Sequence, residues 1–118
     1  MSEYSNVFVV RGKLAGPPQV ETITTKSGKS FNKTTFVLDV EEERKGNNGP
    51  YTATATLKCQ ATEYSVSPQV LSNIPVGSTV LATGKLNGRK NEYNGKVSYF
   101  TDLEVSNVAY GGDNEIPF

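Results

Sequence analysis

The sequence of 118 residues contains no histidine, no tryptophan and one cysteine. A single thiol cannot form a disulfide within the chain, which favours a reducing compartment. With Cys59 and no histidine, the chain has almost no ligands for a zinc site, and it lacks the base of Ser-His-Asp and Cys-His nucleophilic sites. No cluster of acids and bases suits catalysis either. We therefore expect no enzyme, no metal site and no cofactor.

Long apolar runs and an excess of one charge are also missing. The longest apolar run, Val7 to Val10, is too short for a signal peptide or a membrane span, so we expect a soluble, cytoplasmic protein with no membrane partner. Twelve Lys and Arg balance 12 Asp and Glu, and setting aside Asp113 and Glu115 near the C-terminus leaves a net charge of +2. The distribution of the cations is therefore more informative than their sum.

The chain is rich in turn residues, with 11 Gly and 6 Pro, and is long enough for one domain with its own core. Alternating and β-branched patterns predict strands over 6–14, 19–25, 31–40 and 51–57 and on either side of Asn94-Gly95. The composition of 44–50 predicts a mobile loop. Ser67-Pro68 matches an N-cap followed by proline at the first helical position, which predicts a short helix from Pro68 to about Asn73.

Asn94-Gly95 is a strong signal for a two-residue hairpin turn of type I′. With that turn, Leu86 faces Leu103 and Gly84 faces Val105 across the hairpin. One face of the hairpin then forms an inner wall that consists of Val80, Ala82, Gly84, Leu86, Val97, Tyr99, Leu103 and Val105. The opposite face interleaves bases with aromatic side chains. We expect Phe8, Phe36 and Tyr99 to lie in the core.

These elements predict an all-β fold. Five or six short strands with one helix follow the order of the OB-fold, a five-stranded Greek-key barrel with one short helix before the fourth barrel strand. We assign residues 1–108 to this domain and 109–118 to a short flexible C-terminal tail.

Short motifs near both ends of the chain point to one family. They are Gly12-Lys13-Leu14 with Pro18-Gln19-Val20, Gly77-Ser78-Thr79-Val80, Gly84-Lys85-Leu86, Arg89-Lys90 and the terminal Asp113-Asn114-Glu115-Ile116-Pro117-Phe118. Together they resemble the bacterial and bacteriophage single-stranded DNA-binding proteins, whose acidic tip ends in Ile-Pro-Phe. The chain departs from that family by having Asn91 after the Arg-Lys pair, where an aromatic is usual, by having no Trp, and by a very short linker. A compact bacteriophage-type member fits these departures best.

Binding a single strand without reading its sequence needs cations that follow the phosphates and aromatic faces on which bases stack. Residues of both kinds fall at outward-facing positions, namely Arg11, Lys13, Lys33, Lys85, Arg89, Tyr93, Lys96 and Phe100. The resemblance adds Tyr51 as a candidate, and Phe31 is as well placed for packing against a neighbouring chain as for stacking. Asp102 and Glu104 share this face, and we expect them to pair with Lys85 or to repel phosphate. The run Glu41 to Glu43 is interpreted as a solvated face.

The tail predicts a second kind of binding. Ile116 and Phe118, separated by Pro117, are apolar anchors for a partner's pocket, and Asp113 and Glu115 suit a basic rim around it. The resemblance implies a role in DNA replication, recombination and repair, with partner proteins recruited through the tip. It also implies a homo-oligomer, most often a tetramer with a dimer as the alternative, in the cytoplasm of the bacterial host if the protein is phage-encoded. Two alternatives stay open: a primosome-like OB scaffold protein and an RNA-binding OB protein.

Overall fold

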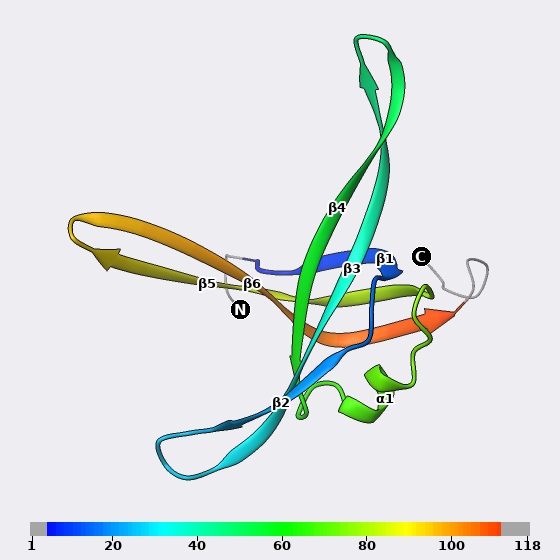
Figure 1. The fold of residues 1–118 in the computed structure, drawn as a ribbon. Helices are drawn as coiled ribbons and strands as arrows, with labels where there is room; N and C mark the ends of the chain where they lie inside the picture. The colour runs from blue at the N-terminus through cyan, green and yellow to red at the C-terminus, as the bar shows by residue number, and fades with distance from the viewer. Residues whose placement is uncertain (1–4, 112–118) are drawn as a thin grey trace.

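Six strands and one short helix make up residues 5–111, the part of the chain that the computed structural model describes (Figure 1). The elements are β1 (Phe8–Leu14), β2 (Gln19–Thr24), β3 (Ser30–Gly46), β4 (Gly49–Thr62), α1 (Pro68–Ser72), β5 (Thr79–Tyr93) and β6 (Lys96–Gly111). Neighbouring strands follow the order β1-β5-β6-β4-β3-β2, and a pairing of β1 with β3 closes five of them into a barrel. This confirms the predicted OB-fold, with α1 before the fourth barrel strand and β2 as an additional strand.

Alternate side chains of the strands fill the barrel. The buried apolar residues are Phe8, Leu14, Phe36, Leu38, Cys59, Ala61, Val66, Leu71, Ile74, Val80, Ala82 and Val105. The prediction that Phe8 and Phe36 lie in the core is therefore confirmed. Burial raises the pKa of the Cys59 thiol to about 11, so this thiol is protonated at neutral pH and is a packing residue rather than a nucleophile.

The helix begins where the sequence predicts. The Ser67 hydroxyl accepts a hydrogen bond from the backbone N–H of Gln69 at 3.3 Å, and Pro68 occupies the first helical turn, where it removes no helical hydrogen bond. Leu71 is fully buried and anchors α1 against the barrel core.

The hairpin of β5 and β6 has the predicted turn and register. Asn94 and Gly95 have φ values of 51° and 77°, which a type I′ turn requires. Tyr93 pairs with Lys96, and Gly84 pairs with Val105 as expected.

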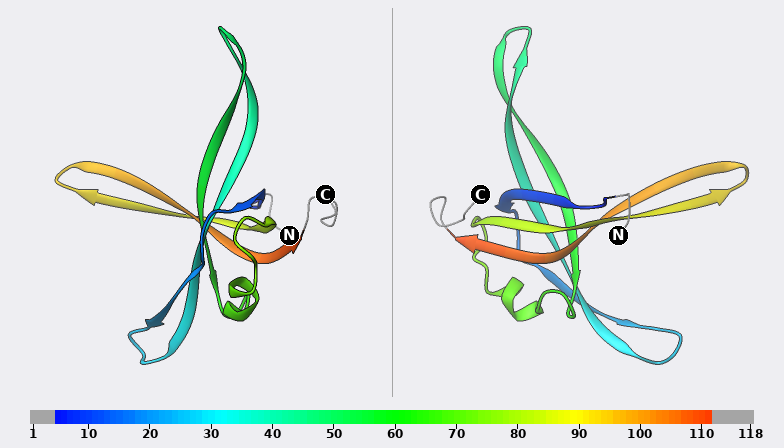
Figure 2. Two further views of the ribbon diagram at one scale, coloured as in Figure 1. Left: turned by 45° about the vertical axis from the view of Figure 1, so that its right-hand side comes forward. Right: turned by 180° about the vertical axis from the view of Figure 1, so that it is seen from behind.

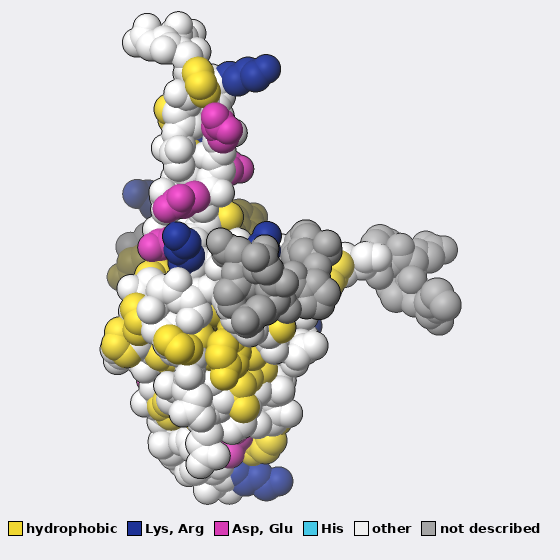
Figure 3. All heavy atoms as spheres, turned by 90° about the vertical axis from the view of Figure 1, so that its right-hand side faces the viewer, with side chains coloured by type: hydrophobic (Ala, Val, Ile, Leu, Met, Phe, Trp, Pro, Cys, Tyr) yellow, Lys and Arg dark blue, Asp and Glu magenta, His cyan; other side chains and the backbone are white. Residues whose placement is uncertain are grey.

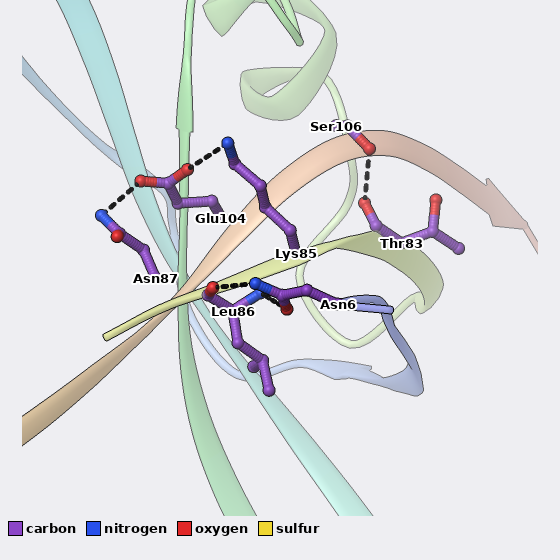
Figure 4. A network of polar contacts seen from close by, with 7 residues as sticks. All are labelled: Asn6, Thr83, Lys85, Leu86, Asn87, Glu104 and Ser106. Carbon is purple, nitrogen blue, oxygen red and sulfur yellow. Dashed lines mark hydrogen bonds and ion pairs between the residues drawn. The ribbon is translucent and has the colours of Figure 1, made fainter. Parts of the chain in front are cut away.

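A β-bulge follows immediately in this hairpin. Between the pairs Gly84–Val105 and Thr83–Asn107, Ser106 is an extra residue whose hydroxyl donates to the Thr83 carbonyl at 3.2 Å (Figure 4). A side chain at Gly84 would place its Cβ 1.9 Å from the Glu104 carbonyl oxygen, so only glycine fits this close approach.

Three hairpins project from the barrel because the pairings that close it are short (Figures 1 and 2). β1 pairs with β3 at two positions, ending at Lys13–Asp39, and β4 pairs with β6 at two positions, Cys59–Leu103 and Gln60–Glu104. Beyond these points the β3–β4 and β5–β6 hairpins have no neighbouring strand. We call residues 41–54 the β3–β4 arm and residues 87–102 the β5–β6 arm.

Two predictions about these arms are wrong. Residues 44–50 are not a mobile loop, because β3 continues to Gly46, β4 resumes at Gly49, and only Asn47 and Asn48 form the turn. Tyr99 is not in the core: it has the inward parity, but it lies beyond the end of the barrel and is 75% exposed. Val97, on the same face, is exposed for the same reason, and Leu86, which pairs with Leu103 at the closing position, is also exposed.

The C-terminal end of the described chain is a strand. β6 continues to Gly111, which pairs with Thr79, so the first three residues assigned to the tail belong to the sheet. The tip residues, Asp113, Glu115, Ile116, Pro117 and Phe118, lie outside the described residues. Within 5–111, no helix has the length and apolar character needed to cross a membrane.

Candidate nucleic-acid interface

A groove of about 480 Å³ crosses the outer surface of the barrel between the β2–β3 hairpin and the base of the β5–β6 arm. One wall comes from β2, β3 and β4 and includes Ile23, Phe31, Lys33, Lys58, Gln60 and Thr62. The other wall comes from β5 and β6 and includes Asn87, Arg89, Asp102 and Glu104. The walls meet where Gln60 of β4 lies beside Glu104 of β6. Lys33 and Arg89 are thus two sequence-predicted residues that the fold brings to one groove.

Ion pairs occupy the β5–β6 wall. Arg89 lies 3.4 Å from Asp102, and Lys85, beside the groove, lies 3.9 Å from Glu104. The second oxygen of Glu104 accepts a hydrogen bond from the Asn87 amide at 2.8 Å, which fixes the carboxylate in place (Figure 4). The predicted pairing of Lys85 with an acid is confirmed. In both pairs the side chain of the cation is the more exposed partner.

Aromatic side chains lie on the same outward face of the β5–β6 arm. The Arg89 guanidinium lies 5.6 Å from the ring centre of Phe100, its cross-strand partner, in cation–π geometry. Tyr93 and Lys96 form the pair next to the turn, and Tyr93 is 75% exposed. The arm therefore presents alternating charge and ring along one face, as the sequence predicts.

The opposite end of the groove is apolar. Ile23 pairs with Phe31 across β2 and β3, and the Phe31 ring centre lies 5.9 Å from that of Tyr64, tilted by 42°. Tyr64 is 77% exposed and was not singled out from the sequence, because it follows β4 in a segment with no alternating pattern. The sequence left the role of Phe31 open, and the structure places Phe31 in the groove wall.

Lys58 is the groove cation that sequence reasoning missed. The predicted strand ended at Leu57, whereas β4 continues to Thr62 and carries Lys58 on the same face as Gln60. In the part of the chain that the structure describes, Lys58 makes no ion pair. The missed signal is the alternation of Lys58 and Gln60 with buried Cys59 and Ala61.

Two predicted cations lie elsewhere. Arg11 and Lys13 point outward from β1 and line a separate depression of about 370 Å³ together with Asp39, Glu41 and Thr79. Its carboxylates balance its cations, so this depression is less suited to a polyanion than the groove.

Tyr51 lies far along the β3–β4 arm, where it pairs with Arg44. The Arg44 Nε donates to Glu42 at 2.6 Å, and this hydrogen bond and charge raise the pKa of Arg44. In Figure 3 this arm projects at the top and carries acidic side chains along its length. The structure therefore does not bring Tyr51 together with the groove residues. Across 5–111, no three His, Cys, Asp or Glu side chains gather in a way that could hold a metal ion.

Comparison of the structure with solved structures finds the same fold in single-stranded DNA-binding proteins. A small single-stranded DNA-binding protein from Streptomyces coelicolor aligns over 89% of this chain and 93% of its own, with 16% identity and a TM-score of 0.58. The Plasmodium falciparum protein, solved in complex with single-stranded DNA, aligns over 93% and 98%, with 18% identity and a TM-score of 0.69.

A deletion mutant of the protein from Thermus aquaticus aligns over 92% of this chain and 51% of its own, with 13% identity and a TM-score of 0.68. No family model and no curated protein matches the sequence itself. At these identities the likeness shows the fold, and at that level the resemblance predicted from the short motifs is confirmed.

Proposed function

We propose that this protein binds single-stranded DNA without reading its sequence, with the strand following the groove and the outward face of the β5–β6 arm. The observation that carries the proposal is the arrangement of Arg89, Phe100 and Lys58 on one continuous outer surface of an OB barrel. Cations with interleaved rings bind phosphates and stack bases, and a ring accepts any base. The shared fold with proteins described as binding single-stranded DNA supports the proposal.

A titration with labelled oligo-dT tests this function. We expect tight binding of oligo-dT in dilute buffer and weak competition by duplex DNA. A matched RNA strand is expected to compete less well than the same strand of DNA. If about four phosphates are contacted, the logarithm of affinity falls with the logarithm of salt concentration with a slope of about −3. No binding at low salt would refute the proposal, whereas equal affinity for RNA would favour the RNA-binding alternative.

The wider role rests on the sequence resemblance. We propose that the protein acts in DNA replication, recombination and repair in the cytoplasm, as a homo-oligomer and without enzymatic activity, and that residues 113–118 recruit partner proteins. Deleting 113–118 is expected to preserve or increase affinity for DNA and to abolish retention of replication or recombination proteins on a DNA-bound column. If DNA affinity falls after the deletion, the assignment of the tip to partner proteins is wrong. Micromolar or weaker DNA affinity with an intact oligomer would favour the scaffold alternative.

A further inference from the structure

Lys33, a cation of the groove wall, has an acidic neighbour on the edge of the sheet. Glu21 of β2 is the direct cross-strand partner of Lys33 of β3, and its carboxylate lies 3.4 Å from the Lys33 ammonium. Directly paired residues share one face of a sheet, and Ile23, two residues along β2, lines the groove. Glu21 is therefore on the groove face, at its margin.

In this ion pair the acid is more exposed than the cation, whereas in the pairs of the other wall the cation is the more exposed. The side chain of Lys33 is 30% exposed and that of Glu21 is 59% exposed, so the acid is the more exposed partner. In the pair of Lys85 and Glu104 the side chains are 67% and 38% exposed, so there the cation is the more exposed partner. We therefore expect a phosphate to compete with the Glu21 carboxylate for Lys33 more than with that of Glu104 for Lys85.

Glu21 is also free to move aside. In the described part of the chain its carboxylate has no hydrogen bond or ion pair other than that with Lys33, and β2 is the last strand of the sheet order, paired with β3 alone. Glu104, by contrast, is fixed by Asn87. The Glu21 carboxylate can therefore rotate into solvent when another anion takes its place.

From this geometry we propose that Glu21 is an internal competitor anion, which occupies Lys33 in the free protein and is displaced when a phosphate of the strand binds there. The inference rests on the proposed function. In it, Glu21 is the residue that limits the affinity of the groove for single-stranded DNA. Because the released carboxylate stays near the strand and attracts a cation from solution, the net release of counterions on binding is smaller than for a cation without an acidic partner.

Four variants measured with the wild type test this coupling: Glu21→Gln, Lys33→Met, the double variant, and Glu92→Gln as a control. Glu92 pairs with Lys90 on the opposite face of the β5–β6 arm, so its substitution changes net charge equally but away from the groove. The readout is the Kd for labelled oligo-dT at several salt concentrations. We expect Glu21→Gln to tighten binding by about two- to fivefold, the range of an exposed ion pair, and to steepen the salt slope by up to about 0.7.

The gain is expected to vanish in the Lys33→Met background, because Glu21 acts through Lys33. An equal gain with and without Lys33, or a gain no larger than that of Glu92→Gln, would overturn the inference while leaving the proposed function intact, since all these proteins would still bind DNA. No binding by either the wild type or Glu21→Gln would overturn both.

Discussion

The β3–β4 and β5–β6 arms are built alike but differ in chemistry. Both are long antiparallel hairpins that leave the barrel beyond a short closing pair of strands. On one face of the β3–β4 arm, Glu41 and Glu43 lie opposite Thr54 and Thr52. The outward face of the β5–β6 arm instead carries the cations and rings described above.

The fold thus contains two similar projecting hairpins, and their side chains determine which of them suits DNA binding. The cation Arg44 of the β3–β4 arm is held by Glu42 on its own strand, whereas Arg89 pairs with Asp102 and also lies over the ring of Phe100. A polyanion is repelled along the first arm and attracted along the second. We therefore expect binding energy to be concentrated in the β5–β6 arm.

The largest effect is expected from reversing two cations of β5, Lys85 just before the β5–β6 arm and Arg89 within it. The double variant Lys85→Glu and Arg89→Glu is expected to weaken oligo-dT binding on the order of 100-fold, because like charges opposed across an interface cost several kcal/mol. The matched control reverses Arg44 and Lys45 on the β3–β4 arm and is expected to change Kd by less than about threefold at 0.15 M salt. Fluorescence anisotropy measures both, with circular dichroism to check folding. Equal losses in the two variants would mean that net charge, not location, governs binding.

The next largest effect on DNA affinity is expected from substituting a tyrosine of the β5–β6 arm. Tyr93 and Tyr99 are equally exposed but lie on opposite faces of the hairpin. Tyr93→Ala is expected to cost about 1–3 kcal/mol of binding free energy through lost stacking, whereas Tyr99→Ala is expected to cost little. Both are measured by titration with oligo-dT at fixed salt. A larger loss for Tyr99→Ala would place the strand on the other face of the arm.

The two tyrosines also show how far sequence reasoning extends. Asn94-Gly95 fixed the register, and the register assigned each residue to a face, because side chains alternate along a strand. The alternation of side chains along a strand does not show at which residue the barrel ends, however. The end depends on the closing pairs Lys13–Asp39 and Cys59–Leu103, which join segments far apart in the sequence. Tyr99 was therefore assigned to the correct face and wrongly to the core.

The candidate site shows the same limit. Outward parity identified Lys33 and Arg89 correctly as surface cations, but nothing local indicated that β2 to β4 and β5 to β6 bring them to one groove while Arg11 lies elsewhere. Lys58 was missed because the predicted strand ended at Leu57, whereas β4 continues to Thr62. The partner of Lys33 was also hidden, unlike that of Lys85, since Glu21 and Lys33 become neighbours only through the register of the β2–β3 hairpin.

The smallest expected effect comes from removing acidic charge on the β3–β4 arm, the arm that we expect to lie outside the DNA path. Glu41 lines the depression that contains Arg11 and Lys13, and Glu43 lies further along the same face. If the strand follows the groove, the double variant Glu41→Gln and Glu43→Gln changes Kd by less than about twofold at 0.15 M salt, because exposed charges beyond about 8 Å are largely screened. If the strand instead crosses β1, removing Glu41 unmasks that depression and tightens binding as much as Glu21→Gln does. A gain of that size, read from the same oligo-dT titration, would put Arg11 and Lys13 in the DNA path and remove the distinction between the two arms.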